Sequence, residues 1–218
     1  MSKKVLFITD SYESLNLKKD TSILMIDEAI KNKLDVFQCE LNDLFIEEDT
    51  VFANSSSILS SQSKFIKDTD KKEIKVSDFK HCFMRKDPPV DEDYINALHL
   101  LGLAEKQGAN VHNKPNSIKE FNEKIFAIHF SKYIPNTLVT SNIKKIHKFF
   151  ERYENIVIKP LDGMGGKSIF KITEFNNQDI DLINNYVNLD FLLNSKIKIP
   201  YLQKKNINKI LNDILNNN

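Results

Sequence analysis

The chain has 218 residues, with 31 basic and 30 acidic side chains and a formal net charge of +1. This balance argues against a protein whose whole surface attracts nucleic acid or an anionic membrane. Hydrophobic residues make up 41% of the sequence and charged residues 28%, which are ordinary values for a globular protein that buries a core.

The first elements predict a parallel α/β arrangement. The run KKVLFIT (3–9) is typical of a strand buried on both faces, and it is too short for a signal-peptide core or a membrane span. We therefore expect a cytoplasmic protein. Thr21 can cap a helix over about 22–33, and LDVFQCE (34–40) follows as a second strand. A strand–helix–strand order predicts parallel pairing with a right-handed crossover.

The middle of the chain continues this pattern. The polar segment SSSILSSQSK (55–64) predicts a surface hairpin. A strand within 78–89 stops at two prolines, and a helix over 91–107 ends before Gly108, a favourable residue just past a helix terminus. A short strand, ANVHN (109–113), comes next.

The second half contains helices and strands in alternation. Ser117 and Glu120 form a capping box that predicts a helix over 117–130. The strand TLVTS is followed by Asn142, which can cap the helix IKKIHKFFERYE. The strands NIVIKP and KSIFKIT enclose a glycine-rich turn, the segment 179–195 is predicted to be helical, and IKIPYLQ (197–203) is strand-like.

The cysteines and histidines give little sign of chemistry. Cys39 and Cys82 fall in predicted strands without a CxxC spacing, so we interpret them as reduced core residues. The histidines are scattered without an HExxH or paired metal spacing, so the sequence assigns no zinc site. They are His81, His99, His112, His129 and His147.

The glycine-rich turn is the strongest local signal. The chain has only 5 glycines, and three of them lie within 163–166. A Walker A loop would need glycine at Leu161, and a dinucleotide fingerprint would need it at Ser168. Both motifs also require a following helix, whereas SIFKIT alternates as a strand does. The turn is therefore a hairpin, which can bind phosphate through its backbone N–H groups with help from Lys159, or can serve turn geometry alone.

Two further features carry charge. MRKDPP (84–89) ends a predicted central strand, where ligands bind in open α/β sheets, and Arg85 can grip a carboxylate with two hydrogen bonds. A surface charge cluster before a proline stop is the alternative. Lys124 lies on the predicted helix over 117–130, where a single lysine is usually solvated.

Five segments, in this order and at this spacing, together resemble prokaryotic glutathione synthetase, a family of ATP-grasp ligases. They are NLKKDTS (16–22), FMRKDPP (83–89), VHNKPNSIKEFNEKIFA (111–127), IPNTLVT (134–140) and IVIKPLDGMGGKSIFKI (156–172). The resemblance implies an α/β fold: a mostly parallel N-terminal pre-ATP-grasp domain, then a partial ATP-grasp domain with a glycine-rich hairpin loop. We expect a substrate domain at 1–116, a lid-like subdomain at 117–203 and an atypical asparagine-rich tail at 204–218.

The resemblance also implies an activity. The family joins γ-glutamylcysteine to glycine with ATP and Mg²⁺, through an acyl phosphate. It implies that Lys124 and Lys159 contact the ATP phosphates and that Arg85 lies where γ-glutamylcysteine binds. The implied loop over the phosphates consists of Asp162, Gly163, Met164, Gly165, Gly166 and Lys167. No catalytic side chain is assigned, and neither a nucleic acid nor a membrane is expected as a partner.

The resemblance fades after about residue 176. We therefore expect a C-terminally truncated form that lacks the Mg²⁺ ligands, and that is inactive alone or complemented by a C-terminal fragment. A non-catalytic nucleotide- or peptide-binding remnant and a different ATP-grasp carboxylate–amine ligase are the alternatives. Assembly into a homo-oligomer is also implied.

Overall fold

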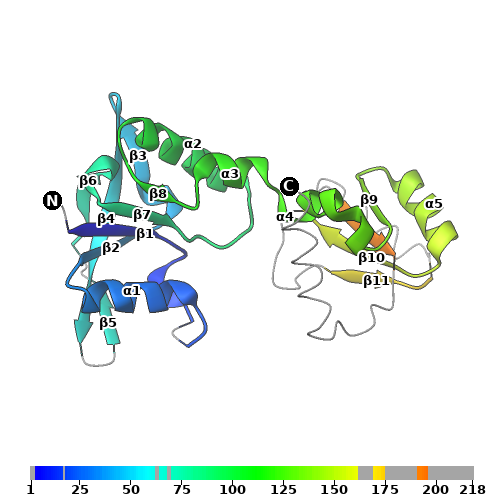
Figure 1. The fold of residues 1–218 in the computed structure, drawn as a ribbon, viewed down its shortest axis with the longest axis horizontal. Helices are drawn as coiled ribbons and strands as arrows, with labels where there is room; N and C mark the ends of the chain where they lie inside the picture. Colours follow the sequence, from blue (N-terminus) through cyan, green and yellow to red (C-terminus); the bar gives the residue numbers. More distant parts are fainter. Residues whose placement is uncertain are drawn as a thin grey trace, which may run out of the picture. The chain divides into compact units, whose positions relative to one another are not determined.

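The computed structural model of the chain describes residues 3–16, 18–61, 64–67, 70–161, 169–174 and 191–195. These residues fall into two compact units, one up to Phe126 and one from Ala127 onward (Figure 1). Each unit has its own sheet.

The first unit is built on a sheet of order β3-β4-β2-β1-β7-β8, with β5 and β6 also paired to β4. Strand β1 pairs in parallel with β2 and β7, and β7 pairs in parallel with β8, so the expected parallel α/β core is confirmed. Strand β4 runs antiparallel to its four partners. The bounds are β1 Lys4–Ile8, β2 Asp35–Cys39, β3 Leu44–Glu47, β4 Thr50–Ser61, β5 Lys64–Lys67, β6 Lys72–Lys75, β7 His81–Met84 and β8 Val111–His112.

Two helices cover opposite faces of this sheet (Figure 1). Successive side chains of a strand point to opposite faces, so Val5 and Phe7 pack beneath α1 (Thr21–Lys31), while Leu6 and Ile8 pack against α2 (Glu92–Lys106). Three short 3-10 helices lie in the connections: η1 Tyr12–Ser14, η2 Leu41–Asp43 and η3 Val76–Asp78. Burial on both faces explains why the central strands are continuous apolar runs.

The helix ends match the predictions in one case and not in another. Gly108 has φ +97° directly after Gln107, the C-cap residue of α2, as expected for a glycine at that position. Thr21, however, does not cap α1. Asp20 does, because its carboxylate accepts the Ser22 backbone N–H at 2.7 Å. The Thr21 side chain is thereby left for another partner.

The predicted continuous helix over 117–130 is wrong. The chain forms α3 (Pro115–Glu120), α4 (Glu123–Phe126) and the 3-10 helix η4 (Ala127–Tyr133). Pro115 starts α3 because its missing N–H is not needed there, which places Ser117 inside the helix rather than at its cap. The Asn122 side chain accepts the N–H groups of Lys124 and Ile125, and so begins α4 as a separate helix.

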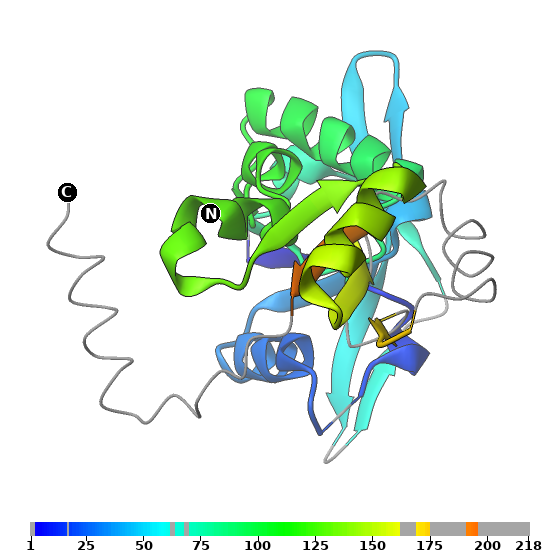
Figure 2. The ribbon, with the colours of Figure 1, turned by 90° about the vertical axis from the view of Figure 1, so that its right-hand side faces the viewer.

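The second unit has an antiparallel sheet of order β11-β10-β12-β9. Its strands are β9 Thr137–Thr140, β10 Ile156–Pro160, β11 Phe170–Ile172 and β12 Phe191–Ser195. Helix α5 (Ile143–Tyr153) packs on one face of this sheet through Ile146. Figure 2 shows α5, in yellow-green, in front of the strands. Asn142 caps α5 as predicted, accepting the N–H groups of Lys144 and Lys145.

Two predictions for this unit have different outcomes. The strands before and after the glycine-rich turn are confirmed as an antiparallel pair, with Ile156 opposite Ile172 and Ile158 opposite Phe170. The predicted helix over 179–195 is wrong at its end, because 191–195 is strand β12, paired on both sides with β10 and β9. The remainder of that prediction and the segment 197–203 lie outside the described residues.

The two cysteines confirm the expectation of reduced core residues. Cys39 and Cys82 are both free and buried on the α2 face of the first sheet. Burial raises the pKa of Cys82 to about 12 and raises the pKa of Cys39 as well. Both thiols therefore remain protonated at neutral pH.

Candidate functional site

The carboxyl end of β7 positions the first candidate, Arg85. Its backbone N–H donates to the carbonyl of Ile8 at 2.8 Å, which continues the parallel pairing of β7 with β1 by one residue. Arg85 therefore leaves the sheet beside the end of β1. Ligands of open α/β sheets bind at this edge. The sequence predicts this position for Arg85.

The Arg85 guanidinium is held by the first turn of α1. Its Nη2 donates to Thr21 Oγ1 at 2.7 Å, and its Nε donates to Ser22 Oγ at 3.3 Å. Two hydroxyls thus orient the planar cation near the N-terminal end of a helix. Both a guanidinium and a helix N-terminus favour an anion such as a carboxylate.

Lys86 is engaged in a different contact. Its ammonium lies 2.8 Å from Asp10 Oδ1, while Asp10 Oδ2 accepts the backbone N–H of Asp87 at 3.1 Å. Asp10 therefore ties the loop after β1 to the loop after β7. This pairing satisfies the charge of Lys86 within the protein and fixes the loop that carries Arg85.

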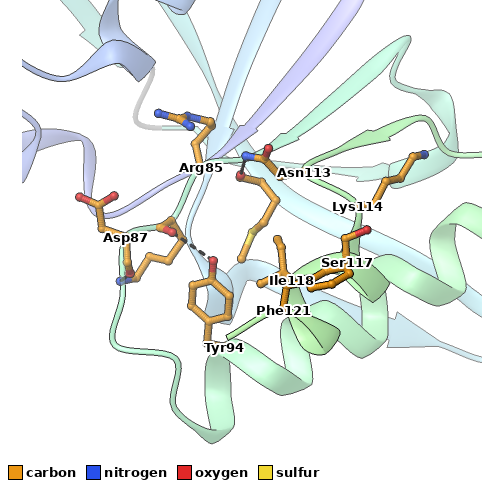
Figure 3. A pocket seen from close by; sticks show the side chains of 10 residues that line it. Arg85, Asp87, Tyr94, Asn113, Lys114, Ser117, Ile118 and Phe121 are labelled. Atoms are coloured by element: carbon orange, nitrogen blue, oxygen red, sulfur yellow. Dashed lines mark hydrogen bonds between the residues drawn. The ribbon is translucent and has the colours of Figure 1, made fainter. Parts of the chain in front are cut away.

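A cavity of about 480 Å³ opens beside these residues (Figure 3). The end of β7 forms one side and the helix α3 forms another, and the lining contains both polar and apolar side chains. Its lining consists of Met84, Arg85, Lys86, Asp87, Tyr94, Asn113, Lys114, Ser117, Ile118 and Phe121. This mixture suits a small polar ligand that carries some apolar surface.

Two hydrogen bonds shape the cavity wall. Asn113 Nδ2 donates to the carbonyl of Met84 at 2.7 Å, and Tyr94 OH donates to the carbonyl of Lys86 at 3.3 Å. Burial, together with Asp87, raises the pKa of Tyr94, so its hydroxyl remains a donor at neutral pH. Asn113 has φ +61°, a left-handed conformation that asparagine tolerates better than most residues.

Lys124 is less exposed than a solvated helical lysine would be. Its side chain is 14% exposed, and its ammonium lies 3.2 Å from Glu123 Oε1. The backbone N–H of Lys124 is bound by Asn122, which fixes the start of α4. Burial of an ammonium is costly unless it is paired, and the contact with Glu123 offsets part of this cost.

Lys159 lies in the second unit on β10. Ile156 and Ile158 of this strand are buried under α5, so the alternation of the strand places Lys159 on the opposite face of the sheet. It directly precedes the last residue of the strand, before the glycine-rich turn. The predicted loop residues Asp162, Gly163, Met164, Gly165, Gly166 and Lys167 lie outside the described residues.

The structure adds residues that the sequence did not assign to the site. Thr21 and Ser22 hold Arg85, and Tyr94 and Asn113 hold the backbone on either side of it. Thr21 and Ser22 belong to the segment NLKKDTS, and Asn113 belongs to VHNKP. These segments indicate the family as a whole, and they do not mark any single residue as part of the site. Hydroxyl and amide side chains are too common in sequences to mark a site before the fold brings them together.

Neither a metal cluster nor a membrane span is found among the described residues. In the part of the chain that the structure describes, no group of three or more His, Cys, Asp or Glu side chains could hold a metal ion. Within the same residues, no helix is both long and apolar enough to cross a bilayer.

Comparison with known families gives two matches that follow each other along the chain. Residues 3–119 match the model of the prokaryotic glutathione synthetase N-terminal domain. Residues 123–204 match the model of the prokaryotic glutathione synthetase ATP-grasp domain.

Curated proteins of the same description are similar over most of the chain. The glutathione synthetase of Buchnera aphidicola subsp. Schizaphis graminum is 39% identical over 171 residues, which cover 78% of this chain and 53% of that protein. The glutathione synthetase of Vibrio vulnificus (strain YJ016) is 36% identical over 185 residues, covering 84% and 58%. The chain thus spans about half the length of the curated relatives it matches.

Solved structures support the fold. The D-cycloserine synthetase DcsG matches with a TM-score of 0.58 at 11% identity, covering 89% of this chain and 60% of that one. A RimK domain ATP-grasp protein from Sphaerobacter thermophilus matches with a TM-score of 0.57 at 12% identity, covering 90% and 65%. At these identities the likeness shows an ATP-grasp ligase fold, and it gives no information on substrate or activity.

Proposed function

The chain belongs to the prokaryotic glutathione synthetase family, and we propose that it supplies the substrate domain and the first part of the ATP site of an ATP-dependent carbon–nitrogen ligase. The proposed reaction joins γ-glutamylcysteine to glycine in the cytoplasm. The observation that carries this proposal is Arg85, oriented by Thr21 and Ser22 beside a cavity at the carboxyl edge of a parallel sheet.

The proposed reaction requires a group that binds the substrate carboxylate. A carboxylate is a poor electrophile, and ATP, bound with Mg²⁺, would supply a phosphoryl group to form an acyl phosphate that an amine can attack. Arg85 would grip a carboxylate of γ-glutamylcysteine with two parallel hydrogen bonds. The apolar part of the cavity lining, which includes Met84, Ile118 and Phe121, would receive the less polar part of the substrate.

The lysines are proposed to contribute charge. Phosphoryl transfer depends on positioning and on neutralising negative charge more than on covalent help from the protein. We assign this role to Lys124 and Lys159, with the backbone of residues 162–167 closing over the phosphates. We propose that the Mg²⁺ ligands come from sequence outside this chain. The chain would then act together with a complementing C-terminal fragment, or as a homo-oligomer.

The test is ligation by a chain that includes the remaining length. The 218-residue chain is joined to the part of the Buchnera aphidicola relative beyond the matched region, and glutathione formation is followed by mass spectrometry. We expect glutathione only when γ-glutamylcysteine, glycine and MgATP are all present, with ADP formed in equal amount. An efficient reaction with a different carboxylate or amine, and none with these, would favour the alternative ATP-grasp ligase.

The chain alone provides the complementary measurement. Calorimetric titration with γ-glutamylcysteine and with MgATP shows whether each ligand binds without the remaining length. Binding of γ-glutamylcysteine is expected, because the residues of the proposed substrate cavity all lie in the first unit. Binding without turnover would support the non-catalytic alternative for this chain in isolation. Absence of any γ-glutamylcysteine binding would contradict the substrate assignment.

A further inference from the structure

Two histidines that are 31 positions apart in the sequence meet on the first sheet. His81 Nδ1 lies 2.9 Å from His112 Nε2. His81 begins β7 and His112 ends β8. This pair lies outside the cavity described above and has no part in the proposed ligation.

The parallel register of the two strands brings the rings together. Phe83 lies opposite His112 in the ladder, and His81 is two residues before Phe83, so all three side chains share one face of the sheet. The His112 ring stacks on Phe83, with ring centroids 4.8 Å apart and an interplanar angle of 18°. Phe83 in turn stacks on Phe7 at 4.9 Å. The position of His112 is therefore set by packing.

The pair is open to solvent. His112 is exposed and His81 is partly exposed. Strand β8 is the last in the order of the sheet among the described strands, so its outer side carries no further strand there (Figure 1). The contact between the two nitrogens is therefore at the surface of the protein.

A third polar group points at the same place. The Asn110 side-chain amide lies 2.9 Å from His81 Nδ1. The nitrogen and oxygen of an amide exchange places by a simple rotation of the side chain, so Asn110 can also present its oxygen to this point. His112 Nε2 and the Asn110 amide thus both lie 2.9 Å from the same atom, His81 Nδ1.

We propose that His81 and His112, with Asn110 as a third ligand, bind a divalent transition-metal ion at the β7–β8 edge of the sheet. Nitrogens that each lie about 2.0–2.1 Å from one ion are about 2.9 Å apart in square-planar coordination and about 3.3 Å apart in tetrahedral coordination. The observed separation of 2.9 Å equals the square-planar value, so Cu²⁺ or Ni²⁺ requires only that the two rings turn until both lone pairs face the ion, and Zn²⁺ also requires a small opening of the pair. Imidazole ligands exclude Mg²⁺ and Ca²⁺, which prefer oxygen.

The tautomer of the pair decides whether it can bind an ion. The 2.9 Å contact between the two ring nitrogens requires one N–H donor. A metal replaces that proton or requires it to move to the far nitrogen of the same ring, so that both facing nitrogens keep a lone pair for the ion.

The test is metal titration of the 218-residue chain. The chain is stripped with a chelator and titrated by calorimetry with Zn²⁺, Ni²⁺ or Cu²⁺, and with Mg²⁺ as the hard-ion comparison. We expect one equivalent of at least one of the transition-metal ions to bind and no saturable Mg²⁺ binding. His81→Gln and His112→Gln are each expected to weaken the affinity at least about tenfold, because each removes a direct ligand.

The matched control is His99→Gln, an exposed histidine on α2. This variant should bind the ion as the unchanged chain does, and circular dichroism of all variants should show the same fold. For Zn²⁺, nitrogen NMR of the histidine rings should place the coordination shift on His81 Nδ1 and His112 Nε2. Absence of saturable binding to the unchanged chain, or unchanged affinity in either variant at 81 or 112, would overturn the proposal.

Discussion

Arg85 Nη2 donates a hydrogen bond to Thr21 Oγ1 over 2.7 Å, although the two residues are 64 positions apart. The contact joins the end of β7 to the first turn of α1. It depends on Asp20 taking the capping position, since a Thr21 that capped the helix would turn its hydroxyl to the backbone. Because Asp20 caps α1, the Thr21 hydroxyl is available to orient the Arg85 guanidinium.

Replacement of Arg85 tests the substrate assignment. Arg85→Lys keeps the charge and removes the planar pair of donors, so we expect γ-glutamylcysteine affinity to fall by about tenfold or more. Calorimetric titration of the chain measures this. The matched control is Arg152→Lys, since Arg152 is the second arginine of the chain and is exposed on α5. Equal affinities of the two variants would remove Arg85 from the site.

Replacement of Lys159 tests the nucleotide assignment. Lys159→Met keeps the length of the side chain and removes its charge, so we expect MgATP affinity to fall by about tenfold or more, the loss of one charged hydrogen bond. Titration with MgATP of the chain joined to the remaining length of its relative provides the measurement. Lys148→Met on α5 is the control, because Lys148 is exposed on the other face of the same unit. If Lys159→Met binds MgATP as Lys148→Met does, the assignment fails.

The core of the first unit is tested by a pair of leucines. Leu98 of α2 is fully buried against the sheet, while Leu24 of α1 is 65% exposed. We expect Leu98→Ala to lower the free energy of unfolding by about 2–5 kcal/mol, and Leu24→Ala by less than about 0.5 kcal/mol. Urea denaturation followed by circular dichroism distinguishes them. Similar losses in both variants would contradict the placement of α2.

The buried thiols give a prediction for reactivity. The pKa of Cys82 is raised to about 12 and that of Cys39 is also raised, so neither residue forms appreciable thiolate at pH 8. Iodoacetamide should label neither cysteine in the folded chain and both in urea, as mass spectrometry would show. Rapid labelling of either residue without denaturant would mean that the α2 face of the sheet opens readily.

The same shifts predict a loss of stability at alkaline pH. An unfolded cysteine ionises near its ordinary pKa of 9.0, whereas folded Cys82 holds its proton to about 12. Between these values the unfolded state binds fewer protons, so the free energy of unfolding falls as pH rises. Urea midpoints measured from pH 7 to pH 10.5 should decline above about pH 9. A flat profile would contradict the burial of Cys82.

The sequence by itself determined the family and most strands. The apolar run at β1 and the alternation after the glycine-rich turn predicted their strands, because burial on one or two faces imposes these patterns. Gly108 and Asn142 marked helix ends, since each works through contacts within a few residues. The segments around MRKDPP and the glycine turn indicated the family, because they occur together in one order and at one spacing.

Only the tertiary structure decided the features that join distant residues. Residues 191–195 carry an apolar run that suits a helix or a strand, and pairing with β9 and β10 on both sides selects the strand. The hydroxyls that hold Arg85 and the imidazole that meets His81 come from segments 63, 64 and 31 positions away. Spacing along the chain gives no sign of such contacts, because the register of parallel strands and the placement of a helix on a sheet create them.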